Sequence, residues 1–75
     1  MKHFRLTAYE AWTVILCIDC KIKHYRDHMK FEIHNAKFAN NTHDRRFWMD
    51  GALDTMHVIH ELKTIRQKMA EQYYQ

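Results

Sequence analysis

The sequence predicts an all-α protein, an antiparallel two-helix hairpin with long helices at about residues 8–39 and 43–73. Three observations predict it: the 75 residues include no Pro and a single Gly, 47% of them are hydrophobic, and the apolar residues recur at helical spacing. A chain with so little Pro and Gly lacks the turns that sandwiches, barrels and multi-loop folds require. At this length we expect residues 1–75 to form one helical-hairpin domain.

A capping box predicts the start of the first helix. Glu10 follows Thr7 by three residues, so the Thr7 hydroxyl can accept from the Glu10 amide while the Glu10 carboxylate accepts from the Thr7 amide. Beyond it, apolar residues at intervals of three and four predict the side that packs against the second helix. These residues are Ala11, Ile15, Ile18, Ile22, Tyr25, Met29, Ile33 and Ala36.

The turn is predicted at residues 39–43, where Asn and Thr cluster. Asn can adopt the left-handed conformation that ends helices, and Thr42 can cap the next one. The second helix then carries a stripe of the same period, which predicts antiparallel packing against the first. This stripe consists of Trp48, Gly51, Thr55, Val58, Leu62, Ile65, Met69 and Tyr73. Gly51 allows either close approach of the helices or a kink.

Each predicted helix also has apolar residues away from its stripe. They are Leu6, Tyr9, Trp12, Leu16 and Cys20 on the first helix and Met49, Ala52, Leu53 and Met56 on the second. A lone hairpin buries too little to offset an ordering cost of about 1.5 kcal/mol per residue. We therefore expect a homo-oligomer, first a dimer forming a four-helix bundle, or a larger assembly. The alternative is a different protein that covers this surface. The predicted partner or oligomer interface comprises Tyr9, Trp12, Leu16, Met49, Leu53 and Met56.

A second candidate site lies at the start of the second helix, where Arg45 and Arg46 precede Phe47 and Trp48. Helix N-termini and Arg side chains bind phosphates, and aromatic rings stack on bases, so these four residues predict a site for an anionic nucleotide. Alternatively, a ring closes the end of the bundle while the arginines stay solvated. In a dimer, Lys2 and Arg5 of one subunit could approach this site on the other.

No metal or cofactor is expected. Cys17, Cys20, His24 and His28 share one helix face, but they extend over about 16 Å of a straight helix and cannot converge on one tetrahedral ion. Cys17 and Cys20 also lie inside the helix, away from the N-terminus that would stabilise a thiolate. We expect two reduced, half-buried thiols and solvated imidazoles.

The net charge of +3 permits an anionic partner without requiring one. A cationic face on the first helix could follow a nucleic-acid backbone, but acidic residues of the second helix balance it, so nucleic acid is a less favoured partner. The face consists of Lys21, Lys23, His24, Arg26, His28, Lys30, His34 and Lys37.

Catalysis is not expected, because the sequence pairs no nucleophile with a base and has no glycine-rich phosphate loop. No signal peptide or membrane segment is expected either, since the apolar run at residues 11–18 ends at Asp19 and is far shorter than the roughly 20 residues that span a bilayer. A cytoplasmic location is the expectation.

The segments LTAYEAW at residues 6–12 and RRFW at residues 45–48 are the most distinctive in the chain. In size, charge and helical character the chain resembles the small basic accessory proteins that bacteriophages encode to act on host factors. The resemblance implies stoichiometric action in the host cytoplasm. The leading hypothesis is a non-enzymatic inhibitor that binds and blocks a host protein, possible targets including antiviral defence proteins. The alternatives are an oligomeric sponge for a signalling nucleotide and a nucleic-acid-binding helical bundle.

Overall fold

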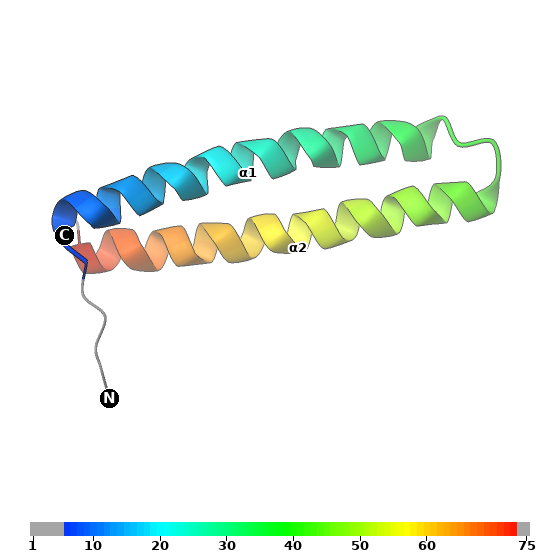
Figure 1. Ribbon diagram of the computed structural model, residues 1–75. Coiled ribbons are helices and arrows are strands. Elements are labelled where there is room, and N and C mark those ends of the chain that lie inside the picture. Colours follow the sequence, from blue (N-terminus) through cyan, green and yellow to red (C-terminus); the bar gives the residue numbers. More distant parts are fainter. Residues whose placement is uncertain (1–5, 74–75) are drawn as a thin grey trace.

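The protein is a two-helix hairpin, as the sequence predicts. A computed structural model describes residues 6–73, with helix α1 at Ala8–Lys37 and helix α2 at Thr42–Tyr73. The helices run antiparallel and side by side along their whole length, so the open end of the hairpin lies opposite the turn (Figure 1). The molecule is a rod measuring 51 × 24 × 17 Å. Assembly into a four-helix bundle is not part of this single-chain structure.

The start of α1 confirms the predicted capping box. The Glu10 amide donates to the Thr7 hydroxyl over 3.1 Å, and the Thr7 amide donates to Oε1 of Glu10 over 2.9 Å. At the other end, α1 stops two residues before the predicted boundary. Phe38 is its C-cap, and the Phe38 amide still donates to the carbonyl of His34 over 3.2 Å.

The turn differs from the prediction in two ways. No residue in the described range 6–73 has a positive φ, so the expected left-handed Asn is wrong. The cap of α2 is also one residue earlier than expected: the Asp44 amide donates to Oδ1 of Asn41 over 2.8 Å, and Thr42 is already helical. The side chain of Asn41 also donates to Asp44 over 3.1 Å. A side-chain amide can thus both accept from the helix and donate to the first-turn carboxylate, which a Thr hydroxyl does less well.

The line along which the two helices pack, which we call the seam, follows α1 largely as predicted. Its α1 residues are Ala11, Ile15, Ile18, Ile22, Tyr25, Met29, Glu32 and Ala36, all buried or partly buried. The exception is Ile33, which was expected in the seam and is 46% exposed, whereas Glu32 is buried. The spacing of four and three continues without interruption through Glu32 and Ala36, as a heptad requires, and Ile33 lies beside the seam.

On α2 the predicted stripe is wrong at three positions. Gly51, Val58 and Ile65 lie beside the seam, and the residue after each of them lies in it. The α2 seam consists of Trp48, Ala52, Thr55, Ile59, Leu62, Arg66, Met69 and Tyr73. It has the uninterrupted spacing of four and three that keeps one helix against another, and it includes Ala52, which the sequence analysis assigned to the second apolar surface.

The core of the hairpin is small. Ile18, Ile22 and Ile59 form its centre, with Tyr25, Met29, Leu62 and Met69 packed around them. Within residues 6–73, three polar contacts join the two arms of the hairpin. The Leu6 amide donates to the Tyr73 hydroxyl over 3.1 Å, Thr55 donates to Glu32, and Arg66 pairs with Asp19 through Nε at 2.5 Å and a second guanidinium nitrogen at 3.3 Å. Neither α1 nor α2 holds a stretch of described residues that is apolar enough to span a bilayer.

Candidate functional site

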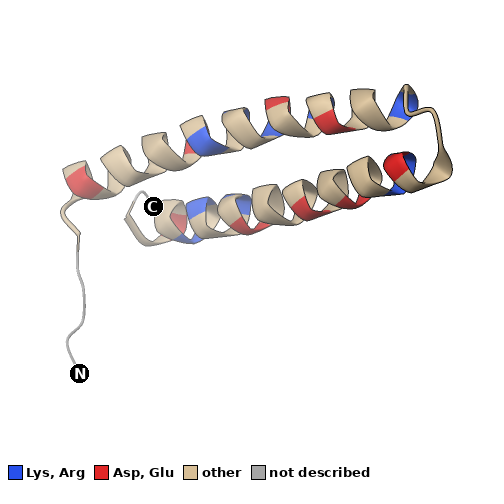
Figure 2. Cartoon of the chain, turned by 45° about the vertical axis from the view of Figure 1, so that its right-hand side comes forward, with Lys and Arg blue, Asp and Glu red and all other residues tan. Residues whose placement is uncertain are grey.

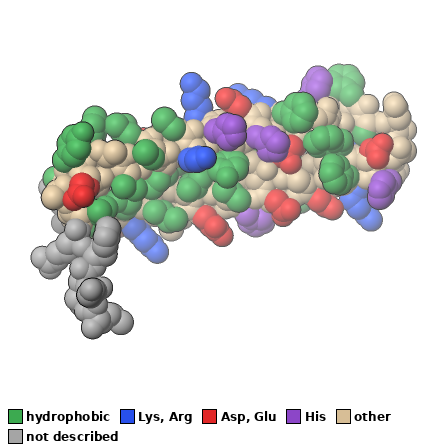
Figure 3. All heavy atoms as spheres, in the orientation of Figure 1, with side chains coloured by type: hydrophobic (Ala, Val, Ile, Leu, Met, Phe, Trp, Pro, Cys, Tyr) green, Lys and Arg blue, Asp and Glu red, His purple; other side chains and the backbone are tan. Residues whose placement is uncertain are grey.

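Both helices present apolar side chains to solvent, and the predicted interface residues are among them. The outer apolar face, as we call it, comprises Tyr9, Trp12, Leu16, Met49, Leu53 and Met56, all of which are exposed. Figure 3 shows hydrophobic side chains exposed along one face of the rod, interspersed with basic, acidic and His side chains. Exposure of this extent on a small protein is typical of an interaction surface.

The two parts of this face lie on the same side of the hairpin. Trp12 directly follows the seam residue Ala11, and Met49 and Met56 directly follow the seam residues Trp48 and Thr55. In an antiparallel helix pair, residues that follow equivalent seam positions flank the same side. The α1 part therefore lies near the open end of the rod and the α2 part near the turn. Ile33, which follows Glu32, adds to the part near the turn.

The predicted anion site is only partly assembled by the structure. Arg45, Arg46 and Phe47 are exposed on the first turns of α2, whereas Trp48 is partly buried in the seam. The Trp48 ring stands edge-on to Phe31 at 5.8 Å and to Phe47 at 5.3 Å between ring centroids. Trp48 therefore packs between the two helices near the turn, in line with the alternative in which a ring closes the end of the structure and the arginines stay solvated.

A groove opens beside Trp48 and carries acidic side chains. This acidic groove, of about 400 Å³, is lined by His28, Glu32, Phe47, Trp48, Asp50, Gly51 and Asp54. Three carboxylates next to the aromatic rings repel an anion. The electrostatics of the groove thus disfavour a nucleotide phosphate close to Trp48.

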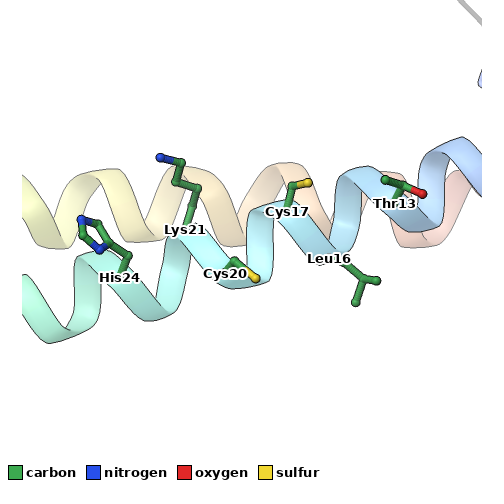
Figure 4. Close-up of a pocket in the computed structure, with 6 residues that line it drawn as sticks. All are labelled: Thr13, Leu16, Cys17, Cys20, Lys21 and His24. Carbon is green, nitrogen blue, oxygen red and sulfur yellow. The ribbon is translucent and has the colours of Figure 1, made fainter.

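The two cysteines border a shallow hollow on α1, of about 520 Å³ (Figure 4). Thr13, Leu16, Cys17, Cys20, Lys21 and His24 line it. Both thiols are free and exposed, not half-buried as expected. Nowhere in residues 6–73 do three His, Cys, Asp or Glu side chains lie close enough together to hold a metal ion.

The cationic face of α1 does not form an unbroken basic surface. Acidic residues interrupt the basic ones along both helices (Figure 2). Among the predicted members of the face, His28 lies 3.6 Å from the carboxylate of Glu32, which neutralises part of its charge when the imidazole is protonated. A continuous phosphate-binding track is therefore not formed by α1 alone. Lys2 and Arg5, the residues expected near the anion site of a second subunit, lie outside the described residues.

Sequence reasoning missed the acidic groove. Its key residue, Glu32, occupies a seam position where a charge is unexpected, and Ile33 next to it offers an apolar substitute at the same helical spacing. The signal that points to the groove is the combination of a charged residue at a heptad position and the only glycine of the chain on the opposing helix.

The chain matches no protein-family model, no curated protein and no solved structure.

Proposed function

We propose that this chain is a non-enzymatic binding protein that blocks another protein, a host protein in the leading hypothesis, by covering part of its surface with the outer apolar face. The observation that carries the proposal is the exposure of Trp12, Leu16, Met49 and Leu53, each between 43% and 51%. Large apolar side chains at the centre of a protein interface supply most of its binding free energy.

The shape of the surface supports a protein partner over a small molecule. The broad side of a 51 × 24 Å rod has about 1,200 Å² in projection, enough for the roughly 800 Å² per partner that a stable protein interface buries. A small ligand needs a concave site, whereas the outer apolar face is spread over exposed side chains of two antiparallel helices. Apolar anchors on a straight helix suit helix-in-groove recognition.

The sponge hypothesis has less support. Asn41 already occupies the amide of Asp44 at the start of α2, and the carboxylates of Asp50 and Asp54 lie beside the rings that would stack on a base. The nucleotide site stays a prediction, to be tested by the loss of nucleotide binding in Arg45→Ala and Arg46→Ala.

Photo-crosslinking tests the proposal whatever the identity of the partner. p-Benzoylphenylalanine in place of Tyr9, in the outer apolar face, is expected to crosslink one polypeptide in the host cell at a fixed ratio. The same substitution at Phe38, an aromatic residue of similar exposure, is the matched control: Tyr9 is 75% and Phe38 65% exposed.

The outcomes separate the alternatives. A Tyr9-specific crosslink to one host protein supports the proposal. A Tyr9-specific crosslink only to a second copy of the chain assigns the face to self-association and overturns its use against a host protein. Equal crosslinks from Tyr9 and Phe38, or none from either, contradict a specific interface on this face.

A further inference from the structure

We propose that the acidic groove binds an organic cation, an ammonium or guanidinium group carried on a hydrocarbon chain. The groove lies beside Phe31, Phe47 and Trp48, whereas the outer apolar face follows the other side of the seam, so the inference does not depend on the proposed function. Three features of the groove carry it: a buried carboxylate whose Oε2 has no donor within residues 6–73, a lining without Lys or Arg, and an aromatic wall.

Glu32 is the buried carboxylate. Its residue is 6% exposed, and its Oε1 accepts a hydrogen bond of 2.6 Å from the hydroxyl of Thr55 across the seam. Its Oε2 accepts no hydrogen bond from residues 6–73. Every fully buried side-chain oxygen of these residues has a hydrogen-bond partner, so Oε2 is not fully buried. Oε2 therefore keeps its access to the groove, where a ligand can reach it.

Gly51 makes room for this arrangement. A Cβ built on Gly51 would overlap Oε2 of Glu32, so any other residue at position 51 would displace the carboxylate. The single glycine of the chain thus permits close approach of the Glu32 side chain to α2, and α2 continues through it without a break.

The groove contains negative charge without a fixed cation. Asp50 and Asp54 add two carboxylates to that of Glu32, and no Lys or Arg of the described residues lines the groove. The one basic group is His28, whose Nε2 lies 3.6 Å from Oε1 of Glu32 and leaves Oε2 uncovered. Thr55 and His28 both contact Oε1, so a cation that reaches Oε2 gives the buried carboxylate a further partner.

The aromatic wall selects an organic cation over a hydrated metal ion. Phe47 is 65% exposed, and its ring stands nearly perpendicular to that of Trp48 at 82°. Ring faces attract ammonium and guanidinium groups and pack against their methylene chains. A groove of about 400 Å³ also has space for such a chain. Two sources offer this chemistry: a free polyamine, or a Lys or Arg side chain of another protein.

Fluorescence titration tests the inference. The chain has two tryptophans, so a Trp12→Phe variant leaves Trp48 as the only one. Titration of this protein with 1,4-diaminobutane or spermidine is expected to give a saturable change in Trp48 emission. The neutral analogue 1,4-butanediol is expected to give none. A capped Ala-Lys-Ala peptide, titrated in parallel, distinguishes the two sources: tighter binding of spermidine indicates a free polyamine, and tighter binding of the peptide indicates a protein side chain.

A variant that removes the charge of the Glu32 carboxylate is the decisive test. Glu32→Gln keeps the shape of the side chain and an oxygen that accepts from Thr55, and it is expected to weaken amine binding at least about ten-fold. Asp27→Asn, which removes an exposed carboxylate of α1 outside the groove, is the matched control and is expected to bind like the parent. Far-UV circular dichroism checks that both variants retain their helices.

Other results overturn the inference. The inference is wrong if the diol binds about as well as the diamine, or if no amine gives a saturable change in Trp48 emission. It is also wrong if the Glu32→Gln and Asp27→Asn variants bind the amine with equal affinity. If Glu32→Gln does not fold, Asp54→Asn replaces it, since Asp54 is exposed and lines the groove. A loss of about three-fold or more is then expected, and an unchanged affinity contradicts the proposal.

Discussion

At the scale of single residues, the polar pairs across the seam fix how the two helices align. Glu32 with Thr55, and Asp19 with Arg66, join positions that face each other only in one register. A shift of one helix by a heptad would keep apolar residues in contact but would leave the carboxylate of Glu32 buried without the hydroxyl of Thr55. Because an unpaired buried charge is strongly destabilising, this pair specifies the observed register.

The contact of Gly51 with Glu32 gives a test of this geometry. In an exposed helix, Gly→Ala raises the free energy of unfolding by about 1 kcal/mol. Here we expect Gly51→Ala to lower it, because the new Cβ displaces the Glu32 carboxylate. In a Glu32→Ala background the same substitution is expected to stabilise the protein by about 1 kcal/mol. Urea unfolding of the four proteins measures both effects, and stabilisation in both backgrounds would show that Glu32 does not lie over Gly51.

Residue-scale features were only partly predictable. The capping pair Thr7 and Glu10 depends on four consecutive residues, so the sequence identified it correctly. The seam positions of Glu32 and Arg66 were missed. A charge at a heptad position is unfavourable unless it is paired, and the sequence does not show which residue pairs with it. Those partners, Thr55 and Asp19, lie 23 and 47 residues away in the chain, where local spacing gives no indication of contact.

At the scale of the helices, side-chain caps determine where each helix starts. Thr7 caps α1 and Asn41 caps α2, each by accepting from the amide three residues later. Each cap satisfies an amide that has no partner within its helix. The starts of both helices are therefore ordered by short-range contacts, and at the open end the Leu6 amide also donates to the Tyr73 hydroxyl of α2 over 3.1 Å.

The capping box makes the stability of α1 depend on pH. The hydrogen bond from the Thr7 amide, followed by that with the Thr7 side chain, holds the pKa of Glu10 below its ordinary value of 4.5. The ionised carboxylate thus stabilises the fold above the unfolded-state pKa, and this contribution is lost as the pH falls through the lower folded-state pKa. We expect Glu10→Gln to lose less stability than the parent between about pH 6 and about pH 3. Thermal unfolding followed by circular dichroism measures this; an equal loss would mean that the ionised form of Glu10 contributes no extra stability in solution.

The cap of α2 distinguishes the structure from the sequence-based expectation. Replacing the N-cap residue by Ala typically costs about 1 kcal/mol, so Asn41→Ala is expected to lower the free energy of unfolding by that amount. Thr42→Ala is expected to change it by less than about 0.5 kcal/mol, because Thr42 is an exposed helical residue. Chemical denaturation of the two variants decides between them. A larger effect at Thr42 would indicate that Thr42, as the sequence predicts, and not Asn41 is the N-cap of α2.

The two helices could be predicted from the sequence, but the exact set of residues that each helix turns toward the seam could not. A chain without Pro, with two apolar stripes and one cluster of Asn and Thr, specifies a hairpin. On α2, however, Val58 and Ile59 are adjacent and both apolar, so either satisfies a period near 3.6. Only packing against α1 selects Ile59, which is 7% exposed against 36% for Val58.

At the scale of the whole molecule, the rod exposes more large apolar side chains than it buries. Within residues 6–73, thirteen large hydrophobic residues are exposed and seven hydrophobic residues are buried, three of which are Ala. A hairpin with so small a core gains much by covering its remaining apolar surface. In an antiparallel dimer, the Trp12 and Leu16 end of one outer apolar face would meet the Met49 and Leu53 end of the other. A partner protein would use the same residues.

The most direct test of the account is native mass spectrometry of the chain purified from the cells that naturally contain it, compared between two matched variants. Leu53→Glu places a charge in the outer apolar face, and Ile65→Glu places one at an equally exposed position outside it, 47% against 48%. We predict that the parent and Ile65→Glu carry a second polypeptide at a fixed ratio and that Leu53→Glu has lost it. A bare monomer in all three, or the same complex in all three, would contradict the claim that the outer apolar face is the binding surface.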